Sequence, residues 1–254
     1  MSRALTIEML FPEIANLHGD NFNITYLSQC RPDARVIRTG LTDTPAFVSG
    51  PVDLIYLGPL TEQGQLKAVE RLTPHRDRIE ALIESGTTFL FTHNALEVLG
   101  TRIRNDEMHY DVPGVGIFEL ESTLAMFGRY NGKVIGTVPE VGSGHPVVGY
   151  KSQFSMVAAP ESLPGFFTAD RGIGRNTTTA VEGVRRNNFL GTSLLGPILV
   201  DNPHFARALL ALLDPHTEPT LAHQEFALAA YEARLDDFRD ERRWHPFERI
   251  RSSG

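Results

Sequence analysis

The segment TTFLFTHNALEVLG, residues 87–100, limits the possible folds of this chain more than any other. Thr88 to Thr92 form a mostly apolar, β-prone run, and Ala95 to Leu99 repeat apolar side chains at helical spacing before Gly100. Only the polar pair His93-Asn94 separates the two patterns. The segment therefore predicts a strand, a tight turn and a helix whose amides and dipole stabilise negative charge. In an open α/β sheet such a junction lies at the carboxyl end of a strand, where ligands bind.

Other strand and helix patterns alternate before this junction. We predict strands at residues 4–11, 35–39 and 52–57, helices at residues 23–29, 62–71 and 76–84, and a loop at residues 40–50. Val52 to Leu57 is almost continuously apolar, as expected for a central parallel strand that is buried on both faces. Asp20 or Asn21 is expected to cap the first helix. The alternation predicts an α/β fold with a mostly parallel sheet covered by helices.

The second half of the chain is richer in strand patterns. Expected strands are residues 108–121, 133–138, 145–157, 176–182 and 188–194, with a turn at residues 128–132 and a loop at residues 165–174. A helix is predicted from Pro203 to Leu213, with proline in its first turn. We therefore divide the chain into a domain at 1–213, a linker at 214–220 that contains two prolines, and a C-terminal amphipathic helix and tail at 221–254. Two interpretations of this helical extension stay open, packing on its own domain or docking on a partner.

Composition excludes several classes of protein. The 254 residues are 41% hydrophobic and 22% charged, which is typical of a globular domain. The formal net charge of -7 argues against a nucleic-acid partner, because such proteins normally present a basic face. A single cysteine, Cys30, excludes an internal disulfide and agrees with a reducing cytoplasm. No run approaches the roughly 20 apolar residues of a membrane span, so we expect a cytoplasmic protein.

Five sequence blocks resemble one protein family in the same order. They are NLHGDNFNI at 16–24, DLIYLG at 53–58, the strand–turn–helix junction, VGY at 148–150 and NFLGTSLLGPIL at 188–199. The family is the glutaminase subunit of lipid II isoglutaminyl synthase, within the class I glutamine amidotransferases similar to cobyric acid synthase. The resemblance covers residues 4–213 and implies a flavodoxin-like class I glutamine amidotransferase fold.

The resemblance also implies a reaction and a partner. In the working enzymes a cysteine thiolate on the elbow attacks the side-chain amide of glutamine, and a histidine from a later strand acts as the base. Ammonia then passes to a partner subunit similar to Mur ligases, which forms a heterodimer with the glutaminase. Backbone amides around the nucleophile form an oxyanion hole. No cofactor is implied.

The residues that carry this chemistry are changed here. His93 stands at the nucleophile position and Leu195 at the base position, while Asn94-Ala95 replaces a pair of glycines. In the turn that starts at Gly58, Pro59 has no amide hydrogen to donate. Loss of one catalytic residue typically costs several orders of magnitude in rate, and leucine cannot move a proton. We therefore expect a catalytically silent subunit that binds or regulates a Mur-ligase-like partner in cell-wall synthesis.

Two functional alternatives stay open. The first is an active glutaminase or amide hydrolase in which His93 and Glu97 exchange protons at a non-standard site. The second is a sensor that binds glutamine or a similar amino acid without turning it over.

The candidate ligand-binding residues are Gly58, Asn94, Glu97, Arg129 and Gln153. Arg129 matches an arginine of the family, and Gln153 lies in the segment that replaces the family's glutamine-side loop. His93 and Glu97 have the i,i+4 spacing of two metal ligands, with His18 or His145 as a third. We favour the interpretation that His93 is hydrogen-bonded and fills the former active-site pocket. We therefore expect no metal site.

Overall fold

A six-stranded sheet forms the centre of the computed structural model, which describes residues 4–139 and 144–243 and the backbone of 248–251. Its strands, in spatial order, are β13 (Val184–Arg186), β14 (Phe189–Thr192), β4 (Thr88–Thr92), β3 (Leu54–Leu57), β1 (Thr6–Leu10) and β2 (Arg35–Thr39). Neighbouring strands are parallel, except that β13 runs antiparallel to β14. The expected mostly parallel sheet is confirmed, and β3 lies at its centre.

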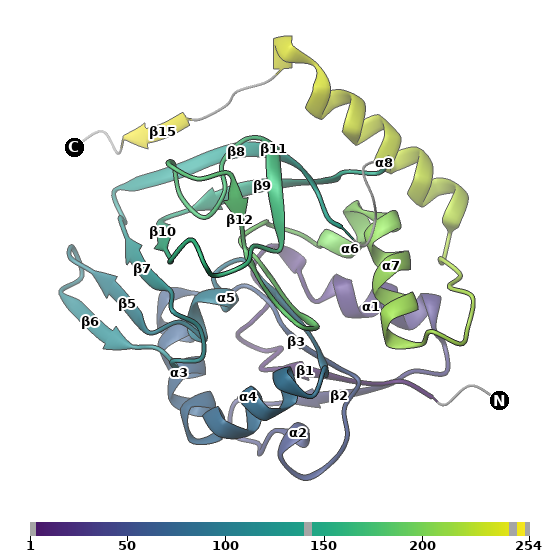
Figure 1. Ribbon diagram of the computed structural model, residues 1–254, viewed down its shortest axis with the longest axis horizontal. Coiled ribbons are helices and arrows are strands. Elements are labelled where there is room, and N and C mark those ends of the chain that lie inside the picture. Colours follow the sequence, from purple (N-terminus) through teal and green to yellow (C-terminus); the bar gives the residue numbers. More distant parts are fainter. Residues whose placement is uncertain (1–3, 140–143, 244–247, 252–254) are drawn as a thin grey trace.

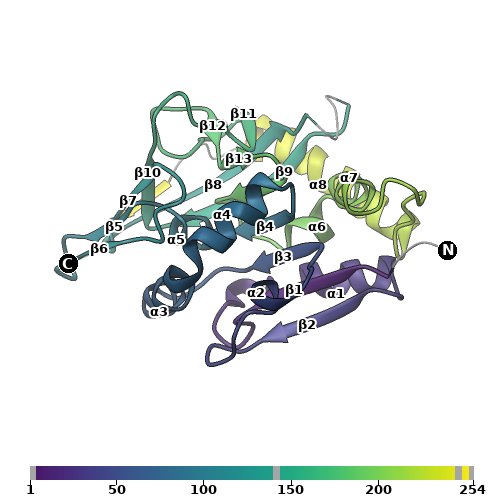
Figure 2. The same ribbon diagram turned by 60° about the horizontal axis from the view of Figure 1, so that its bottom comes forward.

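Helices cover both faces of this sheet (Figures 1 and 2). One group is α1 (Phe22–Cys30), α6 (Ile198–Asp201) and α7 (Pro203–Leu213), and the other is α2 (Ala46–Ser49), α3 (Glu62–Leu72) and α4 (Arg76–Glu84). Alternate side chains of β3 explain the two layers, because successive residues of a strand point to opposite faces. Ile55 and Leu57 join the core under α3 and α4, whereas Leu54 and Tyr56 join the core under α1 and α7.

Two further sheets lie beside the main one. The first contains β10 (Ser155–Ala158), β7 (Glu121–Leu124), β5 (Arg102–Asn105) and β6 (Tyr110–Pro113). The second is built around β8 (Gly128–Thr137), which pairs with β9 (Val147–Gln153), β11 (Phe167–Arg171) and β15 (Glu248–Arg251), while β12 (Val181–Glu182) pairs with β11.

Several predictions in this second half are wrong. The expected turn at residues 128–132 lies inside β8, and the real turn precedes it, where Gly128 N donates to Ala125 O at 2.9 Å. Glycine is common in turns, but here Gly132 pairs with Lys151 of the neighbouring strand and lies inside the sheet. The predicted strand at 108–121 is reduced to β6 and the first residue of β7, since the amides of residues 114–118 bond to the 98–101 segment.

Three other segments also differ from expectation. The predicted loop at 165–174 contains β11, and only the end of the predicted strand at 176–182 is a strand, because the Asn176 side chain accepts from Thr178 N and closes a turn. The predicted single strand at 145–157 is two strands that separate at Phe154. The loop at 40–50 includes the short helix α2.

The C-terminal helix α8 (Gln224–Arg239) packs on its own chain and is followed by a short 3-10 turn, η3 (Glu241–Arg243). Tyr231, Leu235 and Phe238 form a small core with Ile135 and Val148 from β8 and β9. The Lys133 ammonium lies 2.6 Å from the Asp237 carboxylate. The packing interpretation is thus confirmed for this face of the helix. The predicted helix end at His245-Pro246 is wrong, because α8 already ends at Arg239, where Asp240 adopts an extended backbone before η3.

Other features complete the description. Short 3-10 turns occur at η1 (Leu17–Gly19) and η2 (Thr73–His75). Within the described ranges, no helix combines the length and the apolar character that crossing a membrane requires.

Two phenylalanines on α8 provide a matched test of this packing. Phe238 is 7% exposed and Phe226 is 77% exposed. We expect Phe238→Ala to lower the free energy of unfolding by about 3 kcal/mol, because it removes a buried ring and leaves a cavity. Phe226→Ala should change it by no more than about 0.5 kcal/mol. Urea unfolding of both variants measures the difference, and equal effects would contradict the described packing of α8.

Candidate functional site

The junction after β4 is a strained elbow. His93 has a φ of 54°, in the left-handed region that side chains other than glycine rarely adopt. The chain then enters α5 (Ala95–Val98), which is a single turn. The strand, the sharp turn and a helix that stops before Gly100 are confirmed. The expected stabilisation of negative charge by the helix dipole has little basis, because the helix is only one turn long.

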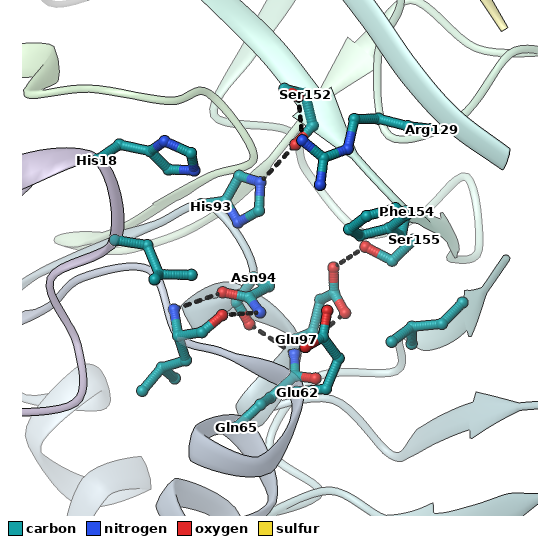
Figure 3. A pocket seen from close by; sticks show the side chains of 13 residues that line it. His18, Glu62, Gln65, His93, Asn94, Glu97, Arg129, Ser152, Phe154 and Ser155 are labelled. Atoms are coloured by element: carbon teal, nitrogen blue, oxygen red, sulfur yellow. Dashed lines mark hydrogen bonds between the residues drawn. The ribbon is translucent and has the colours of Figure 1, made fainter. Parts of the chain in front are cut away.

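A pocket with a volume of about 70 Å³ lies against this elbow (Figure 3). Its walls come from the elbow, α3, the loops around His18 and Leu60, and the ends of β7, β8, β9 and β10. The lining residues are Leu17, His18, Leu60, Glu62, Gln65, His93, Asn94, Glu97, Leu124, Arg129, Ser152, Phe154 and Ser155.

His93 is held by one nitrogen only. Its Nε2 lies 3.2 Å from the carbonyl oxygen of Ser152. Because a carbonyl accepts and cannot donate, Nε2 carries the hydrogen and Nδ1 carries a lone pair. Nδ1 is buried and has no partner in good hydrogen-bond geometry among the described residues, although the adjacent Asn94 side chain interacts with the ring. Burial lowers the pKa of His93, so the imidazole is neutral at pH 7.

Glu97 is a buried carboxyl in the wall of the same pocket. It is 4% exposed and accepts hydrogen bonds from Ser155 Oγ and, at 3.2 Å, from Gln65 Nε2. Burial raises the pKa of Glu97, and these hydrogen bonds and the charge of Lys151 oppose the rise. His93 and Glu97 therefore face one pocket, although His93 precedes the helix and does not share a helical face with Glu97.

The Asn94 side chain is hydrogen-bonded to the backbone of the turn at Leu60. Its Oδ1 accepts from Leu60 N and its Nδ2 donates to Leu60 O, both at 2.9 Å. The backbone amide of Leu60 is therefore already hydrogen-bonded. Pro59 has no amide hydrogen to donate. Gly58 does not line the pocket. A Cβ there would lie 2.5 Å from Ala15 O, so glycine is required by close packing of two backbone segments.

The structure brings Arg129 to the pocket but leaves two other predicted positions outside its lining. The Arg129 guanidinium lies 4.2 Å from the centre of the Phe154 ring and its NH1 donates to Ser152 Oγ at 3.4 Å. Gln153 is buried and donates to Ser155 O at 2.8 Å. Leu195 pairs with Tyr150, and its amide donates to Tyr150 O at 2.8 Å.

Sequence reasoning did not single out Gln65, Glu62, Ser152 and Ser155. Gln65 and Glu62 belong to α3, whose helical pattern carries no sign that its first turn faces the elbow. Ser152 and Ser155 reach the same pocket because the chain changes from β9 to β10 at Phe154. A break in strand alternation at this point was the available signal.

The metal interpretation finds little geometric basis. His18 is near, with its ring centre 6.3 Å from that of His93. The His145 ring instead stacks on the His204 ring of α7, with 3.6 Å between the ring centres. His204 in turn contacts Tyr231 of α8. Across residues 4–139 and 144–243, no three His, Cys, Asp or Glu side chains are grouped so as to hold a metal ion.

The buried carboxyl group of Asp20 contacts Thr92 at the end of β4, next to the elbow. Thr92 Oγ1 donates to Asp20 Oδ2 at 2.5 Å, and the Tyr56 hydroxyl donates to Asp20 O at 2.9 Å. Burial raises the pKa of Asp20 to about 6. The expected capping role is wrong, because neither Asp20 nor Asn21 makes a side-chain cap to α1. Asp20 is taken up by these contacts with β3 and β4.

Asp20 makes stability depend on pH. Its pKa rises from 3.8 to about 6 on folding, so the folded chain binds more protons than the unfolded chain between these values. The free energy of unfolding therefore falls as pH rises through this window, by about 3 kcal/mol for this group. Asp20→Asn should lack this component. Urea unfolding of both proteins between pH 4 and pH 7 tests it, and parallel pH profiles would refute the assignment.

Comparisons with known proteins agree on one fold. The chain is 25% identical over 209 residues to the lipid II isoglutaminyl synthase (glutamine-hydrolyzing) subunit GatD of Staphylococcus aureus, which covers 81% of this chain and 83% of that protein. It superposes on PurLQS from Thermotoga maritima with a TM-score of 0.52 and 12% identity, over 92% of this chain and 100% of that one. A glutamine amidotransferase from the same organism gives 0.50 and 9%, over 93% and 92%. No protein-family model matches the chain.

Proposed function

We propose that this chain, a class I glutamine amidotransferase-like protein close to GatD, is a catalytically silent subunit that binds a partner and does not hydrolyse glutamine. The observation that carries the proposal is the state of His93. Its Nε2 is committed to Ser152 O, and its Nδ1 has no acid or base bonded to it among the described residues. An imidazole without a proton relay is a poor nucleophile toward an unstrained amide.

The surroundings of His93 support the same conclusion. Leu195, at the position where the family has its histidine base, has an aliphatic side chain and lies outside the pocket lining. The Leu60 amide is bonded to Asn94, so it cannot stabilise an oxyanion without breaking that contact. The strained backbone of the elbow is kept while each reactive group has been replaced.

Binding to a partner is the function that such a scaffold retains. The relative GatD is named as a subunit of a synthase. We propose that this chain likewise associates with a Mur-ligase-like subunit of peptidoglycan precursor synthesis, in the cytoplasm. Four large apolar side chains on separate segments remain more than half exposed, namely Phe22, Met108, Phe127 and Phe226.

Ammonia release from glutamine tests the silence of the site. We expect purified chain, alone and mixed with the co-expressed Mur-ligase-like subunit, to release no more ammonia than its His93→Ala variant. GatD of S. aureus with its own partner serves as the positive control. Release that disappears in His93→Ala would overturn the proposal and favour the alternative of an active amide hydrolase that uses His93 and Glu97.

Co-purification tests the partner separately. A tagged chain should retain the Mur-ligase-like subunit on an affinity column, and the pair should elute together in size-exclusion chromatography. Separate elution of the two proteins at micromolar concentration would reject the partner without affecting the conclusion on catalysis.

A further inference from the structure

A second cavity is lined by the loop after β10 and by the loop that connects β11 to β12. Its volume is about 490 Å³, and its lining residues belong to the segments 159–161 and 175–181. None of these residues lines the pocket at the elbow. The cavity is therefore a separate candidate site, with side chains of its own.

Arg175, in the wall of this cavity, is a buried cation. It is 4% exposed and forms no ion pair with any residue in the described part of the chain. Its Nε donates to Gly183 O at 2.7 Å, and its Nη2 donates to Leu163 O and Pro164 O at 2.8 and 2.9 Å. All three partners are neutral carbonyl groups. A buried charge normally lies beside an opposite charge, because removing it from water is costly.

The carboxylate that acts on Arg175 from a distance, Glu182, is already engaged. Glu182 is paired with Lys151 at 3.2 Å and accepts two further hydrogen bonds, from Thr192 Oγ1 and Ser193 N. Burial lowers the pKa of Arg175, and the charge of Glu182 opposes this effect. Arginine stays protonated at pH 7 all the same. The positive charge of Arg175 is thus left for a ligand to neutralise.

Three side chains in the wall have hydrogens to donate. Arg175 Nη1 carries two hydrogens and makes no hydrogen bond to any described residue. Thr179 Oγ1 accepts from Val181 N at 3.1 Å, which leaves its own hydrogen free. Asn176 Nδ2 uses only one of its two hydrogens, on Val157 O at 2.9 Å. A guanidinium, a hydroxyl and an amide therefore face one cavity.

The loop that carries these donors is held in place by its own hydrogen bonds. Gly174 N donates to Thr179 O at 2.8 Å and closes the loop at its base. Within it, Asn176 Oδ1 accepts from Thr178 N at 2.9 Å and from Thr178 Oγ1 at 2.8 Å. A ligand that binds here orders little additional chain, so little of its binding free energy is lost to ordering.

The free donors suit a phosphate group better than a carboxylate. A carboxylate binds arginine most strongly through two parallel hydrogen bonds from two nitrogens of the guanidinium. That arrangement is blocked here, because Nε and Nη2 of Arg175 already donate to carbonyl groups. A phosphate group has acceptor oxygens in several directions and can accept from Nη1, a hydroxyl and an amide together.

The rest of the cavity has room for more than a phosphate group. Ala159, Pro160 and Val181 contribute apolar side chains to its wall. Glu161 also lines it and is exposed to water, so its carboxylate can accept hydrogen bonds from hydroxyl groups. A sugar carries both hydroxyl groups and apolar C–H surface, and it matches this combination.

We propose that this cavity binds the phosphate group of a small ligand, which accepts hydrogen bonds from Arg175 Nη1, Thr179 Oγ1 and Asn176 Nδ2. The phosphate group belongs either to a free phosphate ion or to a sugar phosphate whose hydroxyl groups contact Glu161. The inference goes beyond the proposed function and does not rest on it, because it concerns a different cavity.

Nuclear magnetic resonance of the full-length labelled chain tests the proposal. The probes are inorganic phosphate and acetate, compared at equal ionic strength. We expect phosphate to shift the Thr179 backbone amide and the Arg175 Nε resonance in a saturable way, with a dissociation constant of about 1 mM for so small a ligand. Acetate should bind about tenfold more weakly. Acetate binding as tight as that of phosphate, or no saturable shift with phosphate, would overturn the proposal.

A charge-matched pair of variants assigns the binding to the cavity. Arg175→Gln should weaken phosphate binding about tenfold or more, because the buried cation is lost. Arg35→Gln removes the same charge from an exposed position on β2 and should bind as the unmodified chain does. If Arg175→Gln does not fold, Thr179→Val replaces it, since it deletes the donating hydroxyl at similar volume. Unchanged affinity in a folded cavity variant would reject the site.

Glucose-1-phosphate distinguishes the two sources of the phosphate group. If the ligand is a sugar phosphate, this probe should bind about tenfold more tightly than inorganic phosphate, and Glu161→Gln should remove only that gain. If the ligand is free phosphate, the sugar should add nothing. Either result supports the phosphate site. His93→Ala should leave phosphate binding unchanged, so this test is independent of those for catalysis and for the partner.

Discussion

A buried ion pair holds the second sheet against the elbow. Lys151 of β9 and Glu182 of β12 are 1% and 0% exposed, and their charged atoms lie 3.2 Å apart. Burying two charges is costly unless every remaining polar atom is bonded. Glu182 therefore also accepts from Thr192 Oγ1 at 2.9 Å and from Ser193 N at 2.8 Å. The pair thus connects β9 to the end of β14 in the main sheet.

The position of Ser152 follows from this connection. Ser152 is the next residue after Lys151, and its carbonyl oxygen is the partner of His93 Nε2. Arg129 on the neighbouring strand β8 reaches Ser152 Oγ and lies over Phe154. The wall opposite the elbow is therefore assembled by contacts that start from one buried pair.

The elbow itself keeps a strained backbone without the chemistry that such strain usually serves. A φ of 54° at His93 is unfavourable for a side chain other than glycine, and it persists because parallel pairing of β4 with β3 and β14 fixes the approach of the chain. Behind it, Thr92 and Asp20 hold the turn. The scaffold is preserved by packing and pairing, which do not depend on whether residue 93 reacts.

The sequence alone determined the α/β class, the parallel sheet and the helix at Pro203–Leu213, because hydrophobic periodicity and local turn signals act over short distances. It also determined that His93 stands on a turn after a buried strand. Strand boundaries beyond residue 105 were less predictable, since glycines such as Gly128 and Gly132 are common in turns yet lie within β8 here.

Only the tertiary structure decided the pocket. Gln65 of α3, Glu97 of α5 and Ser155 of β10 meet through long-range packing, and whether Asn94 bonds Leu60 depends on the distance between two loops. Local sequence patterns do not encode such separations, because they result from how whole layers pack against one another.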